Sequence, residues 1–366
     1  MARLHKTGWR GWIYRIVVVF AVLLSIAAFL PLWETDLWWV RMLDYPRLQL
    51  AGVGIVMLLL LVAGSEDYRR RHFGLVFAAL AIATMWQLLH TVRYLPFAPK
   101  AVASAQQCPA DKTLSILNAN VLLGNDDYAA VLAMVERRDP DILVLLEGGP
   151  EWEAAMTPLH ARYGYRIGEP IPNAYGLLFY SKLPFAGVVD MRVAEGVPSV
   201  SGTLTLRDGS DVRIDAVHPE PPWPGDDVGE RDAELVMVGR EIRDDGRAAV
   251  IVGDLNDVAW SKTSRLFLDV SGMEDPRKGR GLLPTFNAHW PLMRWPLDHL
   301  FVSPHWGLVD LAREDRIGSD HFPLYAELCL QKPADRRLVD PRPDAQTSED
   351  ARDELQDGAD ELREQR

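Results

Sequence analysis

Three apolar stretches without a charged residue occupy the first hundred positions of this 366-residue chain, at 16–32, 48–64 and 73–89. Each is 17 residues long, just enough for a helix to cross the hydrocarbon core of a membrane. One such stretch could be a buried core helix, but three in succession with short polar links are typical of an integral membrane protein. We therefore predict an N-terminal region, residues 1–95, with spanning helices at about 13–33, 47–64 and 73–91.

The Lys and Arg residues around these stretches predict how the helices are oriented. Four basic residues precede the first stretch, and Arg69, Arg70 and Arg71 fill the second link, whereas the first link sets two arginines against three acidic residues. Links rich in Lys and Arg remain in the cytoplasm. Because the number of predicted spans is odd, we expect residues from about 95 onward to lie on the extracytoplasmic side of the cell inner (cytoplasmic) membrane.

The rest of the chain is predicted to form a linker, a folded domain and a tail. Residues 96–111 contain three prolines and are expected to form the linker. Residues 101–331 hold 21 Lys and Arg against 35 Asp and Glu, which argues against a large basic surface for nucleic acid. Residues 332–366 are polar and acidic and cannot bury enough apolar surface to fold, so we predict a disordered tail, with a short amphipathic helix at its very end as the alternative. The folded domain is then 112–331.

Apolar strands and helices alternate at the start of this domain. Strands are predicted at 114–120 and 142–147 with a helix at 128–138 between them, a unit that favours parallel strands and an α/β fold. Further predicted strands are 177–180, 201–206, 212–217, 250–252, 300–302 and 324–330, and further helices are 231–242 and 262–270. Cys108 and Cys329 flank the domain, and the sequence leaves open whether they form a disulfide or remain free thiols.

Polar side chains stand at the ends of most of these strands. A lone Asp or Asn at a strand end usually caps a turn. Strand ends on one rim of a sheet converge in space, however, so several such residues together predict a functional site. The candidate residues are Asn120, Glu147, His218, Asp254, Asn256, Asp298, Asp320 and His321.

The residue types in this set indicate one kind of chemistry. Carboxylate and amide oxygens are the ligands of hard cations such as Mg²⁺ or Mn²⁺, and the chain has no Cys/His cluster with zinc spacing. A hard cation beside a histidine that can deprotonate water is suited to in-line attack on a phosphoester. The sequence therefore predicts a Mg²⁺- or Mn²⁺-dependent site for a phosphoester substrate.

Six motifs occur in a fixed order between about residues 113 and 330: NxN, DPDxLxLxE, a strand-ending His, GDxN, LDHxxV and GSDH. In this order the chain resembles the endonuclease/exonuclease/phosphatase (DNase-I-like) superfamily, and its N-terminus resembles that of membrane-anchored bacterial members. The resemblance implies an α/β (α+β) fold, a four-layer sandwich of two mixed β-sheets packed face to face with helices outside. It also implies activity as a metal-dependent phosphoric ester hydrolase.

The resemblance assigns metal ligands residue by residue. Glu147 matches the principal ligand, Asn120 its neighbour at the metal, and Asp320 a carboxylate on the metal side. Asn118 lies on the same face of its strand as Asn120, so the choice of Asn120 rests on the resemblance alone.

The resemblance also assigns the catalytic groups. His321 matches the general base, and Asp298 matches the acid that fixes its tautomer. Asp254 and Asn256 match the pair that orients the nucleophile and holds a phosphate oxygen. His218 matches a second histidine that contacts phosphate or assists the leaving group.

The sequence leaves the substrate open among nucleic acid, a phospholipid headgroup and a small phosphoester. A lipid phosphodiesterase of the sphingomyelinase type suits a membrane anchor, and the aromatic stretch 286–295 could form a membrane-facing or substrate-facing rim. A non-catalytic, membrane-tethered binding module is the alternative to an enzyme, but every expected position carries a competent residue. The sequence indicates no protein partner.

Overall fold

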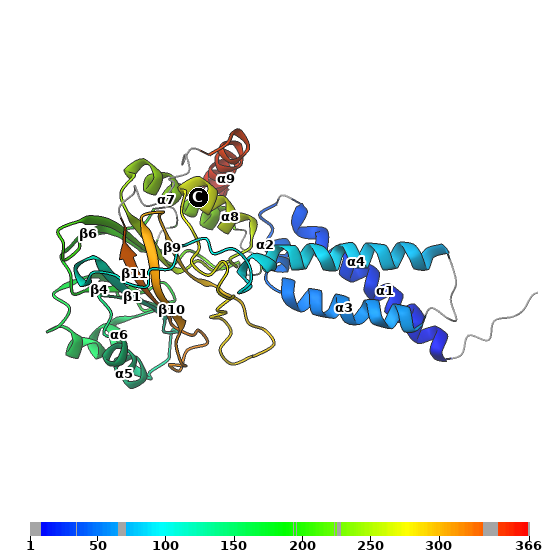
Figure 1. Ribbon diagram of the computed structural model, residues 1–366, viewed down its shortest axis with the longest axis horizontal. Helices are drawn as coiled ribbons and strands as arrows, with labels where there is room; N and C mark the ends of the chain where they lie inside the picture. The colour runs from blue at the N-terminus through cyan, green and yellow to red at the C-terminus, as the bar shows by residue number, and fades with distance from the viewer. Residues whose placement is uncertain are drawn as a thin grey trace, which may run out of the picture. The chain divides into compact units, whose positions relative to one another are not determined.

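The computed structural model describes residues 9–33, 35–64, 71–192, 194, 196–222, 224, 228–331 and 343–364. The chain divides into two compact units, Met1–Arg93 and Tyr94–Arg366. Figure 1 shows a helical N-terminal unit and an α/β unit built on two sheets. We call them the helical unit and the α/β unit and describe each by itself.

Three apolar helices form the helical unit: α1 (Trp9–Phe29), α3 (Arg47–Ala63) and α4 (Arg71–Thr91). Two described stretches, Gly11–Leu32 and Phe73–Tyr94, are long and apolar enough to cross a membrane. A third span is possible only if Trp38–Asp44 and Arg47–Ala63, which are bent by 71° at their junction, count as one. The predicted three spans therefore correspond to two or three membrane-compatible helices.

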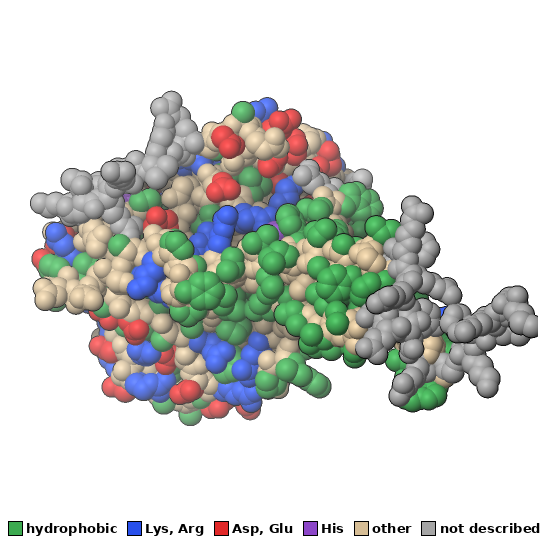
Figure 2. Space-filling model, turned by 45° about the vertical axis from the view of Figure 1, so that its right-hand side comes forward, with side chains coloured by type: hydrophobic (Ala, Val, Ile, Leu, Met, Phe, Trp, Pro, Cys, Tyr) green, Lys and Arg blue, Asp and Glu red, His purple; other side chains and the backbone are tan. Residues whose placement is uncertain are grey.

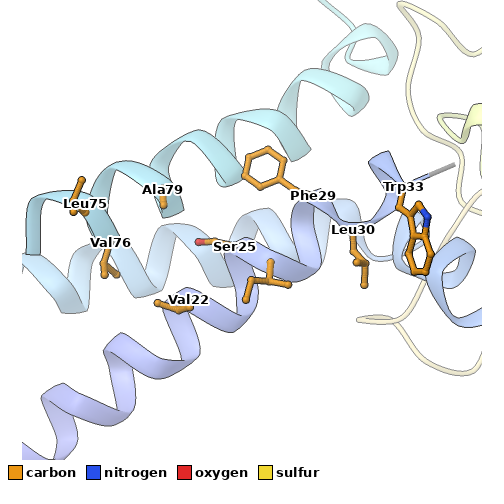
Figure 3. A pocket seen from close by; sticks show the side chains of 9 residues that line it. Val22, Ser25, Phe29, Leu30, Trp33, Leu75, Val76 and Ala79 are labelled. Atoms are coloured by element: carbon orange, nitrogen blue, oxygen red, sulfur yellow. The ribbon is translucent and has the colours of Figure 1, made fainter. Parts of the chain in front are cut away.

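The surface of the helical unit is suited to an apolar surrounding. Ala21, Leu61 and Leu80 form its small core, whereas many large apolar side chains face outward, and apolar side chains dominate its visible surface in Figure 2. An apolar groove of about 630 Å³ runs between α1 and α4 (Figure 3). The buried Arg47 is paired with Asp44 and Gln87, as a charge in an apolar environment must be.

The other described elements of the helical unit are short turns of helix: η1 (Leu30–Leu32), α2 (Trp38–Arg41), η2 (Met42–Asp44) and η4 (Val92–Tyr94), the last reaching the first residue of the α/β unit.

Two mixed β-sheets form the centre of the α/β unit. The six-stranded sheet has the order β10-β11-β1-β2-β4-β3, and the five-stranded sheet has the order β5-β6-β7-β8-β9. The strands of the first sheet are β1 (Thr113–Asn120), β2 (Ile142–Leu146), β3 (Tyr165–Glu169), β4 (Leu177–Ser181), β10 (Trp306–Arg313) and β11 (Leu324–Leu330). Those of the second are β5 (Phe185–Asp190), β6 (Ser199–Thr205), β7 (Asp211–Val217), β8 (Ala249–Asp254) and β9 (Asp298–Val302).

Helices cover the outer face of each sheet. On the first sheet, α5 (Tyr128–Arg138) and α6 (Pro150–Ala155) pack against side chains such as Leu117 and Leu143. On the second, α7 (Gly229–Asp245) and α8 (Lys262–Ser271) pack against Ile251 and Phe301. Short 3-10 turns complete the set: η5 (Ala110–Lys112) and η6 (Thr157–Leu159). The predicted four-layer sandwich is thereby confirmed.

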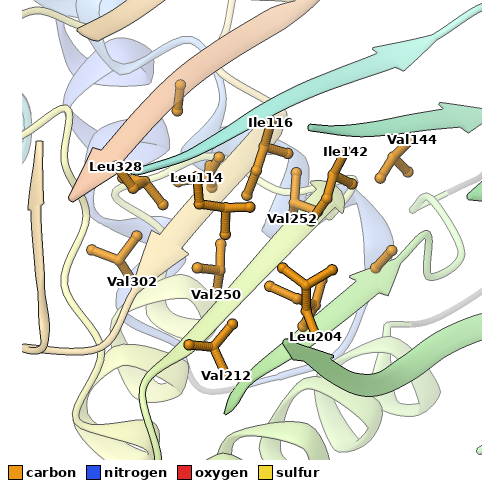
Figure 4. Close-up of a cluster of buried hydrophobic side chains, with 14 of the residues drawn as sticks. Leu114, Ile116, Ile142, Val144, Leu204, Val212, Val250, Val252, Val302 and Leu328 are labelled. Carbon is orange, nitrogen blue, oxygen red and sulfur yellow. The ribbon is translucent and has the colours of Figure 1, made fainter. Parts of the chain in front are cut away.

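The main core lies between the two sheets (Figure 4). Because side chains alternate across a strand, one row of each strand enters this core and the other faces the helices. In β1 the inner row is Leu114 and Ile116, and in β8 it is Val250 and Val252. At one end of the sandwich these apolar rows continue into polar residues, and this determines where the site lies.

Residues 96–111 do not form a free linker. Val102 is fully buried in the core between the sheets, and the backbone around Ala103 and Ala105 is hydrogen bonded to Leu308 of β10. The boundary predicted at about residue 112 is therefore wrong, because these residues pair with an edge strand and the α/β unit begins at Tyr94. Cys108 and Cys329 are joined by a disulfide, which settles the alternative that the sequence left open.

The prediction of a disordered tail is wrong for its second half. Helix α9 (Ala345–Glu364) packs on α7 and α8, with Ala351 and Glu354 buried and Leu355 packed against Val236 and Leu266. The helix is amphipathic, and its few apolar residues gather on one face, so low overall hydrophobicity did not prevent docking. Residues 332–342 of the predicted tail lie outside the described part of the chain.

Candidate active site

The topology brings the polar strand ends to one end of the sandwich. Strands β1 and β2 are parallel, as are β7 and β8, so their carboxyl ends lie together. Strands β11 and β9 are antiparallel to β1 and β8, so their amino ends reach the same place. Asp254 at the end of β8 is directly opposite Asp298 at the start of β9. The inner rows of both sheets thus end in a common polar cluster.

His321 and Asp298 form the centre of this cluster. His321 Nδ1 lies 2.7 Å from Asp298 Oδ2, and both residues are buried. The other carboxylate oxygen of Asp298 accepts a hydrogen bond from the Asn118 amide, 3.1 Å away. The backbone nitrogen of Asp298 donates to Thr285 Oγ1 at 3.1 Å. Asp298 is therefore fixed by β1 of the other sheet and by the loop that holds Thr285, and it fixes the imidazole ring in turn.

Asp254 lies on the opposite side of the histidine ring. Its Oδ2 is 3.5 Å from His321 Nε2 and 4.0 Å from His218 Nε2. The Asn120 amide donates to the same oxygen at 3.1 Å, and the Asn256 backbone nitrogen donates to Oδ1 at 2.9 Å. Gly253 has a φ of +155°, and a Cβ there would lie 1.8 Å from a carbonyl oxygen of β7, so only glycine permits β8 to approach this closely.

Glu147 completes the cluster from the first sheet. Its Oε1 accepts from the Asn120 amide at 2.9 Å, and its Oε2 accepts from the Leu123 backbone nitrogen at 2.8 Å. Glu147 has a φ of 58°, a left-handed conformation that is uncommon outside glycine and often marks functional positions. The side chain of Asn120 therefore links carboxylates from the two sheets.

The electrostatics of the cluster follow from burial and close opposite charges. Burial lowers the pKa of His321, but Asp298 and Asp254 outweigh it and raise that pKa to about 10. Burial raises the pKa of Asp298 above its usual range despite the adjacent imidazole. Burial has the same tendency at Asp254, where the two histidines overcome it and lower the pKa of the carboxyl. One histidine and its two carboxylates thus share charge in a water-poor site.

Several atoms in the cluster could hold a cation. One ligand atom each of Asp254, Asp298 and His321 lies within 4.8 Å of the other two. Asp320 Oδ1 is buried and has no hydrogen-bond partner, and the same holds for Asn118 Oδ1. Unpaired buried oxygens are costly in water-poor surroundings and are the donors that a hard cation satisfies. The donor set therefore fits a divalent cation.

The sequence that builds this cluster matches a known family. Residues 117–321 match the sequence profile of the Endonuclease/Exonuclease/phosphatase family, and this match covers more than half of the chain. This chain belongs to the endonuclease/exonuclease/phosphatase family. Family members are in general metal-dependent phosphoesterases. A search of curated proteins found no match.

Several solved structures have the same fold as this chain. An endonuclease/exonuclease/phosphatase from Beutenbergia cavernae is 18% identical, with a TM-score of 0.51 over 60% of this chain and 72% of that one. A family protein from Bacteroides thetaiotaomicron is 20% identical, with a TM-score of 0.50 over 62% and 100%. The catalytic domain of human Nocturnin, solved with a bound sulfate, is 14% identical, with a TM-score of 0.50 over 65% and 100%. At such identities the likeness concerns the fold.

The structure gathers most of the residues that the sequence singled out as the family site. Those in mutual contact are Asn120, Glu147, His218, Asp254, Asp298 and His321. The amide of Asn256 donates to the Pro219 carbonyl at 2.9 Å, and only its backbone nitrogen contacts Asp254. The carbonyl of Asp320 accepts from the Ala288 nitrogen at 2.6 Å, and the charge of its carboxylate helps to raise the pKa of His321.

Two residues of the site were absent from the predicted set. Asn118 was set aside in favour of Asn120, although strand alternation puts both on the inner face, and its contact with Asp298 follows from that. Thr285 lies in a loop without a strand or helix pattern, so no local signal pointed to it. His299, by contrast, is buried between Arg277 and the Asp257 carbonyl, away from the reacting groups.

Proposed function

We propose that this chain is a membrane-anchored, Mg²⁺- or Mn²⁺-dependent phosphoester hydrolase with His321 as general base. The observation that carries the proposal is the chain of contacts from Asn118 through Asp298 and His321 to Asp254. A buried carboxylate that accepts from one ring nitrogen turns the other nitrogen toward water. A cation held by the neighbouring carboxylates would lower the raised pKa of the ring, so that this nitrogen can accept a proton. The arrangement is suited to activating water for attack on a phosphoester.

The side chains divide the hydrolysis between them. Because Asp298 holds Nδ1–H, His321 Nε2 is the nitrogen that takes the proton from the attacking water. Asp254, 3.5 Å from Nε2, accepts the second hydrogen of that water and orients it for in-line attack. The new P–O bond forms as the bond to the leaving oxygen breaks, and His218 stabilises that oxygen. The Asn256 amide is assigned to a phosphate oxygen.

Glu147, Asn120 and Asp320 would hold the cation. Their oxygens suit Mg²⁺ or Mn²⁺ better than zinc, and the unpaired Oδ1 of Asp320 supports the assignment. When bound, the cation supplies positive charge that stabilises the negative charge developing on the phosphoryl group.

Two observations support an α/β unit outside the cytoplasm. The disulfide between Cys108 and Cys329 suits an oxidising compartment. Two to three apolar helices with basic residues at the N-terminus and in the second link favour a multi-pass anchor in the inner membrane with that orientation.

Hydrolysis by the full chain in detergent tests the proposal. With Mg²⁺ or Mn²⁺, the panel is bis-p-nitrophenyl phosphate, plasmid DNA, single-stranded DNA, sphingomyelin and phosphatidylinositol phosphates. We expect turnover of at least one substrate that stops in EDTA and returns with the cation. No turnover of any substrate would favour the alternative, a membrane-tethered binding module without catalytic activity.

A further inference from the structure

A hairpin beside the site presents apolar side chains to solvent. Residues 286–295 form it, with Phe286 N donating to the Trp295 carbonyl at 2.9 Å and Asn287 N to the Met293 carbonyl at 3.1 Å. In Figure 1 it belongs to the yellow loop that projects from the sandwich. At its tip Trp290 is 67% exposed and Leu292 is 83% exposed. An ordered hairpin that exposes such residues is typical of a surface that contacts something apolar.

The base of this hairpin is fastened to the residues that hold the reacting groups. The ring of Phe286 lies 4.9 Å from the ring of His321. The Ala288 nitrogen donates to the Asp320 carbonyl at 2.6 Å. Whatever the hairpin tip contacts is therefore held next to the catalytic cluster.

Three arginines surround the ring of Phe322, the residue that follows His321. The guanidinium carbons of Arg313, Arg294 and Arg316 lie 4.2, 4.9 and 5.9 Å from the centre of that ring. All three donate to backbone carbonyls, and within the described part of the chain none pairs with a carboxylate. Burial, and then the charge of Arg294, lower the pKa of Arg313, which shows that these charges repel each other.

Such a cluster is unusual in a strongly acidic region. Residues 101–331 carry 35 acidic against 21 basic residues, and many of their arginines are paired with carboxylates, for example Arg138, Arg213 and Arg277. Three unneutralised guanidinium groups retain free N–H donors, which form strong hydrogen bonds with phosphate oxygens. On the face drawn in Figure 2, Lys and Arg side chains likewise gather next to apolar ones.

We propose that the hairpin tip and the arginine cluster form a docking surface for an anionic phospholipid bilayer. Trp290, Leu292 and Met293 would enter the interface, and the three arginines would bind headgroup phosphates beside them. An exposed apolar tip matches the apolar interior of a bilayer, and the arginines at its rim match the anionic headgroups. The apolar helices of the same chain keep a bilayer at high local concentration, because the α/β unit begins directly after Arg93.

Docking on a bilayer would name the substrate class of the proposed hydrolase, and this part of the proposal rests on the proposed function. A bilayer docked at the hairpin tip brings the phosphoesters of lipid headgroups close to His321, in preference to a nucleic-acid strand, which the acidic charge balance repels. The docking itself needs no hydrolysis, so the two proposals can fail separately.

Fluorescence of the full chain in nanodiscs tests the docking. Both native cysteines are in the disulfide, so a Leu292→Cys variant carries a single thiol for an environment-sensitive dye. A Val188→Cys variant is the matched control, since Val188 is an apolar residue of β5 that is 59% exposed. The discs contain phosphatidylcholine with or without phosphatidylglycerol, plus a nitroxide-labelled lipid as quencher, all in EDTA.

We expect the nitroxide lipid to quench the dye at position 292 in anionic discs, less at high salt, and to leave the dye at 188 unquenched. Because one arginine contributes about 1 kcal/mol at an anionic surface, Arg316→Gln should lower the ratio of docked to undocked label about fivefold. Arg316 is exposed, and an unchanged melting temperature shows that the variant folds.

Three results would overturn the docking surface. One is a dye at 292 that is quenched no more than the dye at 188. Another is quenching that ignores both lipid charge and Arg316→Gln. The third is a dye at 292 that responds to added single-stranded DNA and not to lipid, which would assign the surface to nucleic acid.

Discussion

Replacement of Asp298 by Asn examines the base assignment with almost no change in shape. The side-chain amide introduced at position 298 would present its oxygen to His321 Nδ1 and its NH₂ group to Asn118. Since Asn118 Oδ1 has no partner, a rotation of the Asn118 amide lets that oxygen accept from the new NH₂ group. We therefore expect the Asp298→Asn protein to fold, with one buried negative charge removed.

The loss of activity can be worked from the hydrogen bond between Asp298 and His321. The carboxylate of Asp298 lies 2.7 Å from Nδ1 and stabilises the imidazolium that forms when His321 takes the proton from water. A hydrogen bond to a charged group contributes about 1.5–3 kcal/mol and a neutral one about 1 kcal/mol. Replacing the carboxylate with an amide therefore costs about 1–2 kcal/mol, or about tenfold in kcat. If the amide instead turns its NH₂ group to Nδ1, the ring is held in the wrong tautomer and the loss moves toward about 10⁴-fold.

Initial rates of bis-p-nitrophenyl phosphate hydrolysis at saturating Mg²⁺ or Mn²⁺ measure this effect. Asp141→Asn is the matched control: Asp141 is also a buried aspartate, but it lies before β2, at the opposite end of the sandwich, where it pairs with Arg207. It should lose stability and keep kcat. An Asp298→Asn enzyme within threefold of wild type would refute the role of Asp298.

Three further changes test the fold. Burial raises the pKa of Glu234 from 4.5 to about 7. The folded state therefore binds this proton more tightly, and the free energy of unfolding falls by about 3 kcal/mol as the pH rises through that window. Glu234→Gln should remove this pH dependence from urea titrations at pH 5 and 8, and an unchanged pH dependence would contradict the prediction. Replacing Cys108 and Cys329, 221 residues apart, with Ser should lower stability by about 2–4 kcal/mol, and two free thiols in the denatured, unreduced wild type would exclude the disulfide. Ala351→Arg should undock α9 at a cost of about 1–3 kcal/mol, seen as faster proteolysis of that helix; an unchanged cleavage rate would argue against its packing.

The inner strands could be predicted from the sequence because burial on both faces leaves a clear apolar pattern. β3, β5 and β10 were not predicted, and all three are edge strands. An edge strand has one neighbour and more exposed positions, as the alternating burial of β5 shows, so its pattern is weak. The polar residues at the ends of the inner strands could be found because each one follows such a clear apolar run.

The contacts of the loop that holds Thr285 and the packing of helix α9 could not be predicted. Thr285 orients Asp298 from a long loop that no periodicity marks. Helix α9 was concealed by its acidic composition, although the spacing of Ala351 and Leu355 already placed both on one face. Asn118 needed only the alternation rule and was passed over because the resemblance favoured Asn120.

The proposal that His321 acts as a base in cation-dependent hydrolysis is tested most directly by one assay. Wild type and His321→Ala are stripped with EDTA, returned to Mg²⁺ or Mn²⁺, and assayed side by side on bis-p-nitrophenyl phosphate. We predict that the cation restores wild-type hydrolysis and that His321→Ala remains about 10²–10⁴-fold slower in kcat with its fold intact. Full activity in excess chelator, or a His321→Ala rate within threefold of wild type, would contradict the account.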